Sequence, residues 1–114
     1  MSRLSTHILD TSLGRPAVGV AVVLEIAASA GAWIEISRGI TDADGRVKDL
    51  LPDDEPIVPG DYRLRFATAD YFRKLGQIAF YPEVVVHVRL DGSANRYHLP
   101  LLLNPFGYST YRGS

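Results

Sequence analysis

The sequence lacks cysteine altogether, and this absence removes several kinds of chemistry. Without a thiol the chain can form no disulfide, no thiolate nucleophile and no sulfur ligand for a metal. An excess of charge of one sign is also missing, because 12 Lys and Arg residues against 13 Asp and Glu leave a formal net charge of −1. This balance argues against nucleic acid or an anionic membrane surface as the main partner.

Long hydrophobic runs are absent as well. No stretch approaches the roughly 20 apolar residues that a membrane-spanning helix needs, and residues 1–4 lead into patterned sequence without the apolar segment of a signal peptide. We therefore expect a soluble, cytoplasmic protein with no membrane partner. The 114 residues, 46% of them hydrophobic, predict a single domain over residues 1–114 that buries its own core.

Alternation of apolar and polar residues dominates the chain, which is typical of half-buried β-strands. The clearest alternating runs are residues 18–26, 34–40, 61–66 and 84–90. In the second run Ile34, Ile36 and Ile40 are in phase, so we expect them to form its apolar, buried face. Asp-Gly and Pro-Gly turn signals lie between the runs.

Residues 70–76 break the alternation and predict one short helix. Asp70 is a candidate N-cap, apolar residues follow at helical spacing, and Gly76 stands where the helix should end. Seven or eight short strands with one helix predict an antiparallel β-sandwich. A sandwich is favoured over a barrel because the strands differ in length and one connection carries the helix.

Three histidines are present, His7, His87 and His98. His7 and His98 each fall on the polar face of a predicted strand, and alternation alone favours surface histidines there. His87 lies between two valines and is the firmest surface residue of the three. A zinc site made of all three is weakly supported, because metal motifs usually place two ligands at close spacing. A Ser-His-Asp triad is weaker still, since no nucleophile-elbow motif is present.

Arg46 follows the turn signal of residues 41–45 and begins a predicted strand. It is either a solvated arginine beside a loop or a fixed guanidinium aimed at an anionic or carbonyl-rich ligand. Arginine suits the second role better than lysine because its planar fork donates two parallel hydrogen bonds.

Four stretches carry a family resemblance: LSTHILDTSLGRPAVGV, TDADGR, FYPEVVVHV and YHLPLLLNPFGYSTYRGS. In this order and spacing they resemble the 5-hydroxyisourate hydrolases, which belong to the transthyretin-related proteins of urate breakdown. The resemblance covers residues 4–114. Its most specific part is the ending Tyr111-Arg112-Gly113-Ser114, which separates the hydrolases from the hormone-carrying transthyretins. Leu99 and Asn104 depart mildly from the expected valine and serine.

The resemblance implies a sandwich of two four-stranded antiparallel sheets with one short α-helix. It implies a homotetramer, a dimer of dimers whose central channel is lined by the sheet face that carries His7 and His98. The implied reaction opens 5-hydroxyisourate at its N1–C6 amide to give 2-oxo-4-hydroxy-4-carboxy-5-ureidoimidazoline in purine degradation. No metal and no other cofactor is implied.

Site residues follow from the resemblance position by position. His7, Arg46 and His98 would be catalytic, and His7, Arg46, Tyr111 and Ser114 would bind the substrate. Imidazole titrates near neutral pH, so either histidine fits the role of general base. Arg46 would orient the ring and stabilise the developing oxyanion. The chain's last residues would then be ordered because they wall the site.

Two functions of other classes stay open. A non-catalytic carrier could hold a small aromatic ligand in the tetramer channel, but it would not need His7, Arg46 and His98 together or the YRGS ending. A structural, immunoglobulin-like sandwich could serve adhesion, but such a domain would usually be secreted or part of a longer chain. The hydrolase is the function that the residues favour.

Overall fold

The computed structural model describes residues 2–52, 54 and 56–113. Nine strands, one α-helix and one short 3₁₀ turn (Ser29–Gly31) make up this part of the chain. The elements are β1 (Ser2–Asp10), β2 (Arg15–Pro16), β3 (Ala21–Ala27), β4 (Trp33–Ile40), β5 (Arg46–Pro52), β6 (Gly60–Phe66), α1 (Thr68–Lys74), β7 (Val84–Leu90), β8 (Tyr97–Asn104) and β9 (Gly107–Thr110). Over the described residues, no helix is long and apolar enough to cross a membrane.

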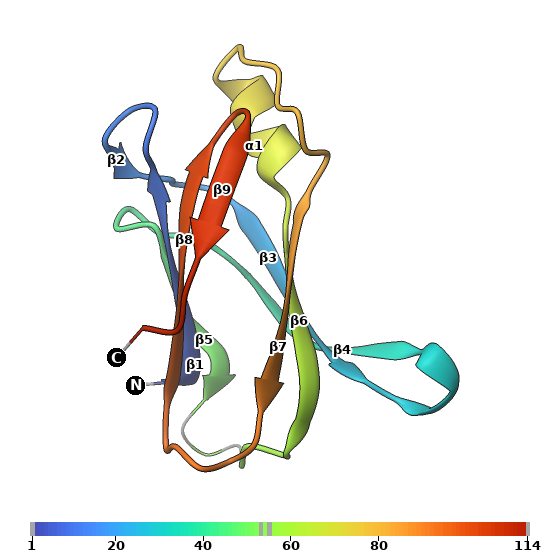
Figure 1. The fold of residues 1–114 in the computed structure, drawn as a ribbon. Helices are drawn as coiled ribbons and strands as arrows, with labels where there is room; N and C mark the ends of the chain where they lie inside the picture. Colours follow the sequence, from blue (N-terminus) through green and yellow to red (C-terminus); the bar gives the residue numbers. More distant parts are fainter. Residues whose placement is uncertain (1, 53, 55, 114) are drawn as a thin grey trace.

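The strands form two sheets that face each other, as Figure 1 shows. One sheet has the order β4-β3-β6-β7 and is antiparallel throughout. In the other, β1 lies between β5 and β8, and β9 follows β8. The expected sandwich is confirmed, with two additions in this second sheet. The two-residue β2 adds a fifth strand, and β1 runs parallel to β8, which joins the two ends of the chain side by side.

The core lies between the sheets and is filled by the inward half of each alternating strand. Its fully buried side chains include Ile8, Leu24, Leu64, Phe66 and Leu101. The predicted alternation holds over residues 61–66, where Tyr62 and Leu64 are buried. The first predicted run begins later than expected, because β3 starts at Ala21 and Val18 is exposed.

Strand β4 does not bury its isoleucines as expected, because Ile34, Ile36 and Ile40 are exposed. A register shift between Leu24 and Glu25 of β3 places Ile34 opposite Ile26, whereas beyond the shift Ser37 and Gly39 face the core side, opposite Leu24 and Val22. At Ser37 and Gly39 the reason is the close approach of β5. A Cβ on Gly39 would lie 2.6 Å from a methyl carbon of Val47, and the Ser37 hydroxyl donates to the main-chain oxygen of Leu50. Small residues are therefore required on the inward face.

Helix α1 begins earlier than its sequence pattern indicates. It starts at Thr68 after Ala67, so Asp70 lies in the first turn and is not the N-cap. Burial of Tyr71 and Phe72 against the core places the helix, which is a tertiary effect that outweighs capping preference. The predicted end is confirmed. Gly76 has φ +75°, and its amide donates to the main-chain oxygen of Arg73 as in a Schellman motif.

Asp10 is a fully buried carboxylate that ties the end of β1 to α1. Its Oδ1 accepts from the amides of Ser12 and Leu13, at 2.9 and 3.3 Å, and from the Ser12 hydroxyl. Its Oδ2 accepts from the Tyr71 hydroxyl at 2.7 Å. Burial and this hydrogen bond raise the pKa of Tyr71, so the phenol stays a donor at any physiological pH. A buried carboxylate is tolerated only with such a set of donors.

Replacing Tyr71 by Phe should lower the free energy of unfolding by about 1–3 kcal/mol, because one oxygen of Asp10 loses its donor while the ring is kept. Tyr81→Phe is the matched control, since the Tyr81 ring lies edge-on to Phe80 and Tyr108 and keeps these contacts. Urea denaturation measures both variants. Equal stability of the two would mean that the Asp10–Tyr71 bond is energetically neutral.

Candidate active site

Three neighbouring strands place the predicted site residues on one outer sheet face. Alternation along β1 buries Leu4 and Thr6 and turns Ser5 and His7, both half-buried, to the opposite face. Antiparallel pairing sets Arg46 of β5 opposite His7. Parallel pairing sets His98 of β8 beside Ser5. The three residues predicted as catalytic therefore converge on one face from three strands.

Arg46 is positioned by a tight turn before β5. The Asp42 carboxylate accepts from the amides of Asp44 and Arg46, at 2.9 and 3.1 Å, and these hydrogen bonds help to lower the pKa of Asp42. Gly45 has φ +74°, and a Cβ there would lie 2.5 Å from the main-chain oxygen of Ile8. Only glycine fits this conformation and this contact. The predicted turn is confirmed, and it brings Arg46 into register with β1.

His98 is held from two sides. Its Nδ1 lies 2.8 Å from the Ser5 hydroxyl. On the other side the end of the chain crosses it, since the Gly113 amide donates to the His98 main-chain oxygen at 2.8 Å. A Cβ on Gly113 would lie 2.8 Å from Cδ2 of the imidazole. The absence of a side chain at Gly113 is what allows this approach.

The electrostatic environment keeps His98 neutral. Burial lowers its pKa most, and the neighbouring Arg46 and His7 lower it further. A neutral imidazole at physiological pH has a lone pair available for proton transfer. His98 therefore has the protonation state that a general base requires.

A pocket of about 780 Å³ opens on this face. It is lined by Ser5, Thr6, Arg46, Val47, Lys48, Asp49, Arg96, Tyr97, His98 and Gly113. Of the predicted residues, Arg46 and His98 thus line it, whereas His7 lies beside Arg46 without lining it. Tyr111 is 58% exposed and also lies outside the lining. Ser114 is outside the described residues.

Sequence reasoning missed most of the residues that line this pocket, among them Ser5, Lys48 and Arg96. Alternation did place Ser5 on the face of His7, but its contact with His98 depends on the β1–β8 register, which no local pattern encodes. The third histidine was predicted correctly as a surface residue. His87 is exposed on β7 in the other sheet, next to Trp33 and 3.9 Å from Asp61, so the three histidines do not converge.

Comparison with known proteins decides the family. A family model described as HIUase/Transthyretin family matches residues 4–113, nearly the whole chain. The chain belongs to this family.

Both 5-hydroxyisourate hydrolases and a transthyretin are similar to this chain. A 5-hydroxyisourate hydrolase of Salmonella dublin is 48% identical over 97% of this chain and 80% of its own. A 5-hydroxyisourate hydrolase of Mus musculus is 42% identical over 99% of this chain and 96% of its own. Among solved structures, transthyretin from Sparus aurata superimposes with a TM-score of 0.92 at 32% identity, over 99% of this chain and 97% of its own. The 5-hydroxyisourate hydrolase of Klebsiella pneumoniae superimposes with a TM-score of 0.82 at 35% sequence identity. The superposition covers 97% of this chain and 98% of the Klebsiella chain.

Gly113→Ala tests how the end of the chain packs on His98. The added methyl must displace the imidazole or lift the chain end, so the His98 ring resonances should shift in NMR spectra and stability should fall by about 1 kcal/mol. Gly107→Ala is the matched control, because a Cβ there would meet its nearest atom at 3.8 Å. Unchanged His98 resonances in Gly113→Ala would show that the chain end does not press on the ring.

Proposed function

We propose that the protein hydrolyses 5-hydroxyisourate by opening its six-membered ring at the N1–C6 amide. The observation that carries the proposal is the convergence of Arg46, His98 and the chain end on one pocket, in a family that includes a hydrolase matched over 96% of its length. Water adds across the amide. Its hydroxyl goes to C6, which becomes a carboxylate, and a proton goes to N1, which leaves as the end of a ureido group. The product is 2-oxo-4-hydroxy-4-carboxy-5-ureidoimidazoline, an intermediate of purine degradation.

His98 is the proposed general base. The sequence left His7 and His98 open for this role, and the lowered pKa of His98 favours His98. Its neutral ring takes a proton from water as the oxygen attacks C6. The resulting imidazolium then delivers a proton to N1, so that the base is regenerated in the same cycle.

Arg46 is the proposed oxyanion stabiliser. Its guanidinium lines the pocket and is exposed, so it can offer two N–H donors to a carbonyl oxygen of the planar substrate. Donors aimed at a developing oxyanion are each worth about 3–4 kcal/mol in acyl-transfer enzymes. The positive charge of Arg46 also lowers the pKa of His98, so the residue that would stabilise the oxyanion also favours the neutral, basic form of His98.

His7, Tyr111 and Ser114 are proposed to bind the substrate from the edge of the pocket. His7 and Tyr111 do not line it in the single chain, so their contact with the substrate depends on how subunits assemble. The cytoplasmic location and the independence from metal ions stay predictions, which cell fractionation and treatment with a chelator test.

Transport of a ligand without catalysis is the second candidate, and a specific observation favours it. The TM-score with transthyretin is higher than with the Klebsiella hydrolase, and a related sea bream transthyretin structure contains thyroxine. The backbone is common to both functions, however, so it does not discriminate between them. Sequence identity is higher to the Salmonella and mouse hydrolases than to transthyretin.

His98→Ala and Arg46→Ala should each reduce kcat/KM about a hundredfold or more, because one removes the base and the other the charge that stabilises the oxyanion. Absorbance of 5-hydroxyisourate, made from urate with urate oxidase, measures the decay. His87→Ala is the matched control and should keep nearly full activity. In the wild type, kcat/KM should fall as His98 is protonated, with a midpoint below the ordinary histidine value of 6.5.

Two outcomes would contradict this assignment. No acceleration by the wild-type protein would favour the carrier. Equal losses in all three variants would point to a metal site or to general destabilisation, which melting temperatures and addition of zinc distinguish.

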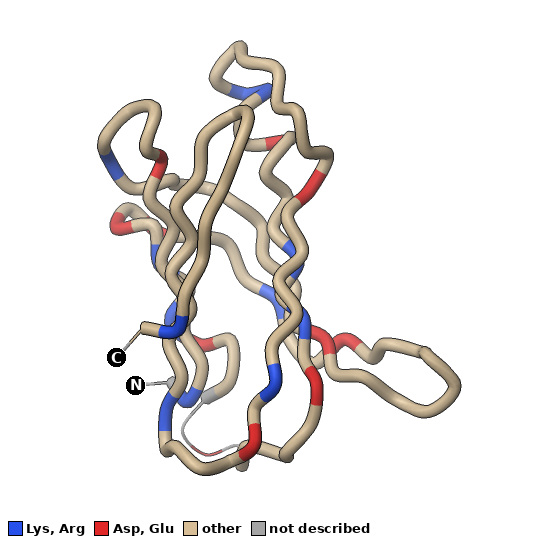
Figure 2. Tube along the Cα trace, in the orientation of Figure 1, with Lys and Arg blue, Asp and Glu red and all other residues tan. Residues whose placement is uncertain are grey.

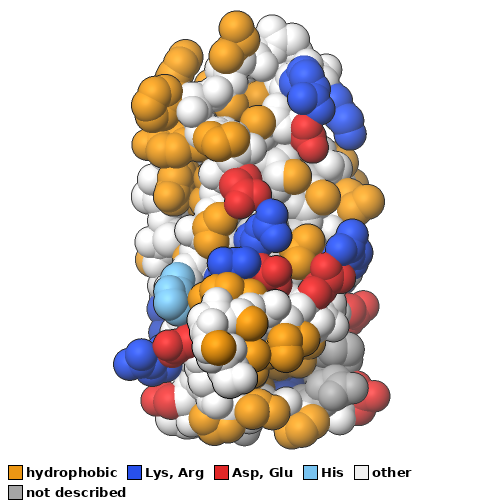
Figure 3. All heavy atoms as spheres, turned by 90° about the vertical axis from the view of Figure 1, so that its right-hand side faces the viewer, with side chains coloured by type: hydrophobic (Ala, Val, Ile, Leu, Met, Phe, Trp, Pro, Cys, Tyr) orange, Lys and Arg blue, Asp and Glu red, His pale blue; other side chains and the backbone are white. Residues whose placement is uncertain are grey.

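We also propose a homotetramer, a dimer of dimers whose central channel is lined by the sheet face that carries His7 and His98. The end of the sandwich with α1 and the β8–β9 turn is proposed to contribute to the contacts between subunits. Residues 97–111 contain no Lys, Arg, Asp or Glu, and Figure 2 shows this hairpin free of charge. Large exposed hydrophobic residues occur here and in the segment after α1, namely Ile78, Phe80, Phe106 and Tyr108. Figure 3 shows hydrophobic side chains gathered over the upper part of one face. Exposed patches of this kind mark interfaces.

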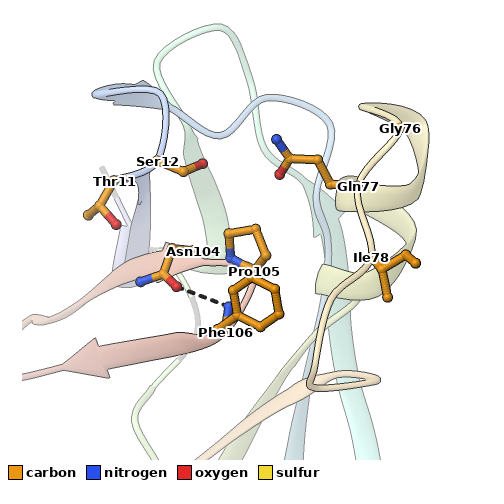
Figure 4. Close-up of a pocket in the computed structure, with 8 residues that line it drawn as sticks. All are labelled: Thr11, Ser12, Gly76, Gln77, Ile78, Asn104, Pro105 and Phe106. Carbon is orange, nitrogen blue, oxygen red and sulfur yellow. Dashed lines mark hydrogen bonds between the residues drawn. The ribbon is translucent and has the colours of Figure 1, made fainter.

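A hollow of about 750 Å³ lies within the same region. Figure 4 shows Ile78 at the right of this region, Phe106 and Pro105 near its centre, and Ser12 and Gln77 above them. The amide of Phe80 donates to the main-chain oxygen of Pro105 at 2.7 Å, which joins the two segments that border it. A hollowed surface lined by uncharged residues suits docking of a second subunit.

Phe106→Glu should shift the protein to smaller species, because a carboxylate would be buried in the contact between subunits. Activity should fall with the loss of assembly if His7 and Tyr111 act across it. Ile40→Glu is the matched control, since Ile40 is similarly exposed but lies on β4 away from this surface. Size exclusion with light scattering and initial rates measure both. A wild-type monomer with full activity would refute the tetramer.

A further inference from the structure

We propose that Ser5 is a positioning residue, whose hydroxyl holds His98 in the tautomer that leaves Nε2 free to accept a proton. The inference deepens the proposed function and rests on it, because it concerns the base of the proposed reaction. Ser5 lies outside the residues that the family resemblance assigned.

The contact is built into the sheet. Ser5 and His98 are register partners on the parallel strands β1 and β8, and both side chains are half-buried on the same face. Ser5 Oγ lies 2.8 Å from His98 Nδ1, a full-strength hydrogen bond. Because a neutral imidazole carries only one N–H, the partner of Nδ1 decides whether Nε2 is a donor or an acceptor.

The imidazole cannot relieve this contact by turning over. Its Nδ1 edge faces Ser5, and its Cδ2 edge faces the backbone of Gly113, where even a Cβ would come within 2.8 Å. A flipped ring would lose the hydroxyl and place Nδ1 against the Gly113 backbone. The two neighbours therefore clamp the ring in one orientation, which directs Nε2 away from Ser5.

For His98 to act as the base, Nε2 must keep its lone pair, so the one hydrogen of the neutral ring lies on Nδ1. The Ser5 hydroxyl oxygen is 2.8 Å away and can accept this hydrogen. Nδ1 then donates to Ser5 Oγ, and Nε2 stays free to accept a proton.

The charged or titratable groups that line the pocket with the ring, or act on its pKa, are His7 from β1, Arg46, Lys48 and Asp49 from β5, and Arg96 just before β8. Burial lowers the pKa of His98 most, and Arg46 and His7 lower it further, so the neutral ring is favoured. Within the neutral ring, the hydrogen bond to Ser5 selects the nitrogen that accepts the proton.

Kinetics give the first test. Imidazole in water prefers its hydrogen on Nε2, so Ser5→Ala should block the basic nitrogen in most molecules and lower kcat about tenfold with KM nearly unchanged. Ser5→Thr keeps a hydroxyl at this position of β1, and threonine is well tolerated in a strand, so this variant should have a kcat close to that of the wild type. Ser37→Ala is the matched control, because it removes a serine hydrogen bond in the other sheet. Full kcat in Ser5→Ala, or failure of Ser5→Thr to restore it, would overturn the inference.

The ¹⁵N shifts of the His98 ring give a second test, which does not depend on catalysis. Above the pKa, the wild type and Ser5→Thr should show Nδ1 as the protonated nitrogen, and Ser5→Ala should move toward Nε2–H. A wild-type ring protonated on Nε2 would overturn the inference, even if Ser5→Ala fails to fold. Full activity of His98→Ala would show instead that His98 is not the base. That result would contradict the proposed function, whereas the tautomer measured by NMR would be unaffected.

Discussion

The alternation of strand β1 between two faces is the constraint on which the fold and the site both depend. β1 is paired on both sides, with β5 and with β8, so it cannot slip without breaking two sets of hydrogen bonds. A shift by one residue would turn the buried Leu4 and Ile8 to solvent and bring His7 into the core. The free energy of burial thus holds the polar face in register.

Around this strand the site is completed by pieces that are far apart in the sequence. The turn before β5 supplies Arg46, and its geometry rests on the Asp42 carboxylate and on Gly45. The last described residues supply a side-chain-free contact, in which Gly113 bonds to the main chain of His98. The interior end of β1 is secured separately, by Asp10 and Tyr71. The pairing of β1 with β5 on one side and with β8 on the other brings Arg46 and His98 to one face.

The same sandwich occurs in hydrolases and in hormone carriers, and the backbone hardly distinguishes them. Transthyretin from Sparus aurata superimposes on this chain at least as well as a bacterial hydrolase does. In this chain, Arg46 and His98 line the same pocket on the sheet face. A neutral His98 beside a cationic Arg46 suits proton transfer and anion stabilisation together, which simple binding of an aromatic ligand does not require. A common scaffold can carry different functions because the side chains placed on it differ.

The sequence alone determined the sandwich, the buried faces of residues 61–66 and 84–90, the turn before Arg46 and the surface position of His87. These follow from periodicity and turn chemistry, which are local. The tertiary structure decided the rest. Close packing of β5 against Gly39 turned the neighbouring Ile40 outward, and burial of Phe72 moved the start of α1. The Ser5–His98 contact joins residues 93 positions apart. Such contacts depend on register and on neighbouring volumes, and no segment of the chain contains that information by itself.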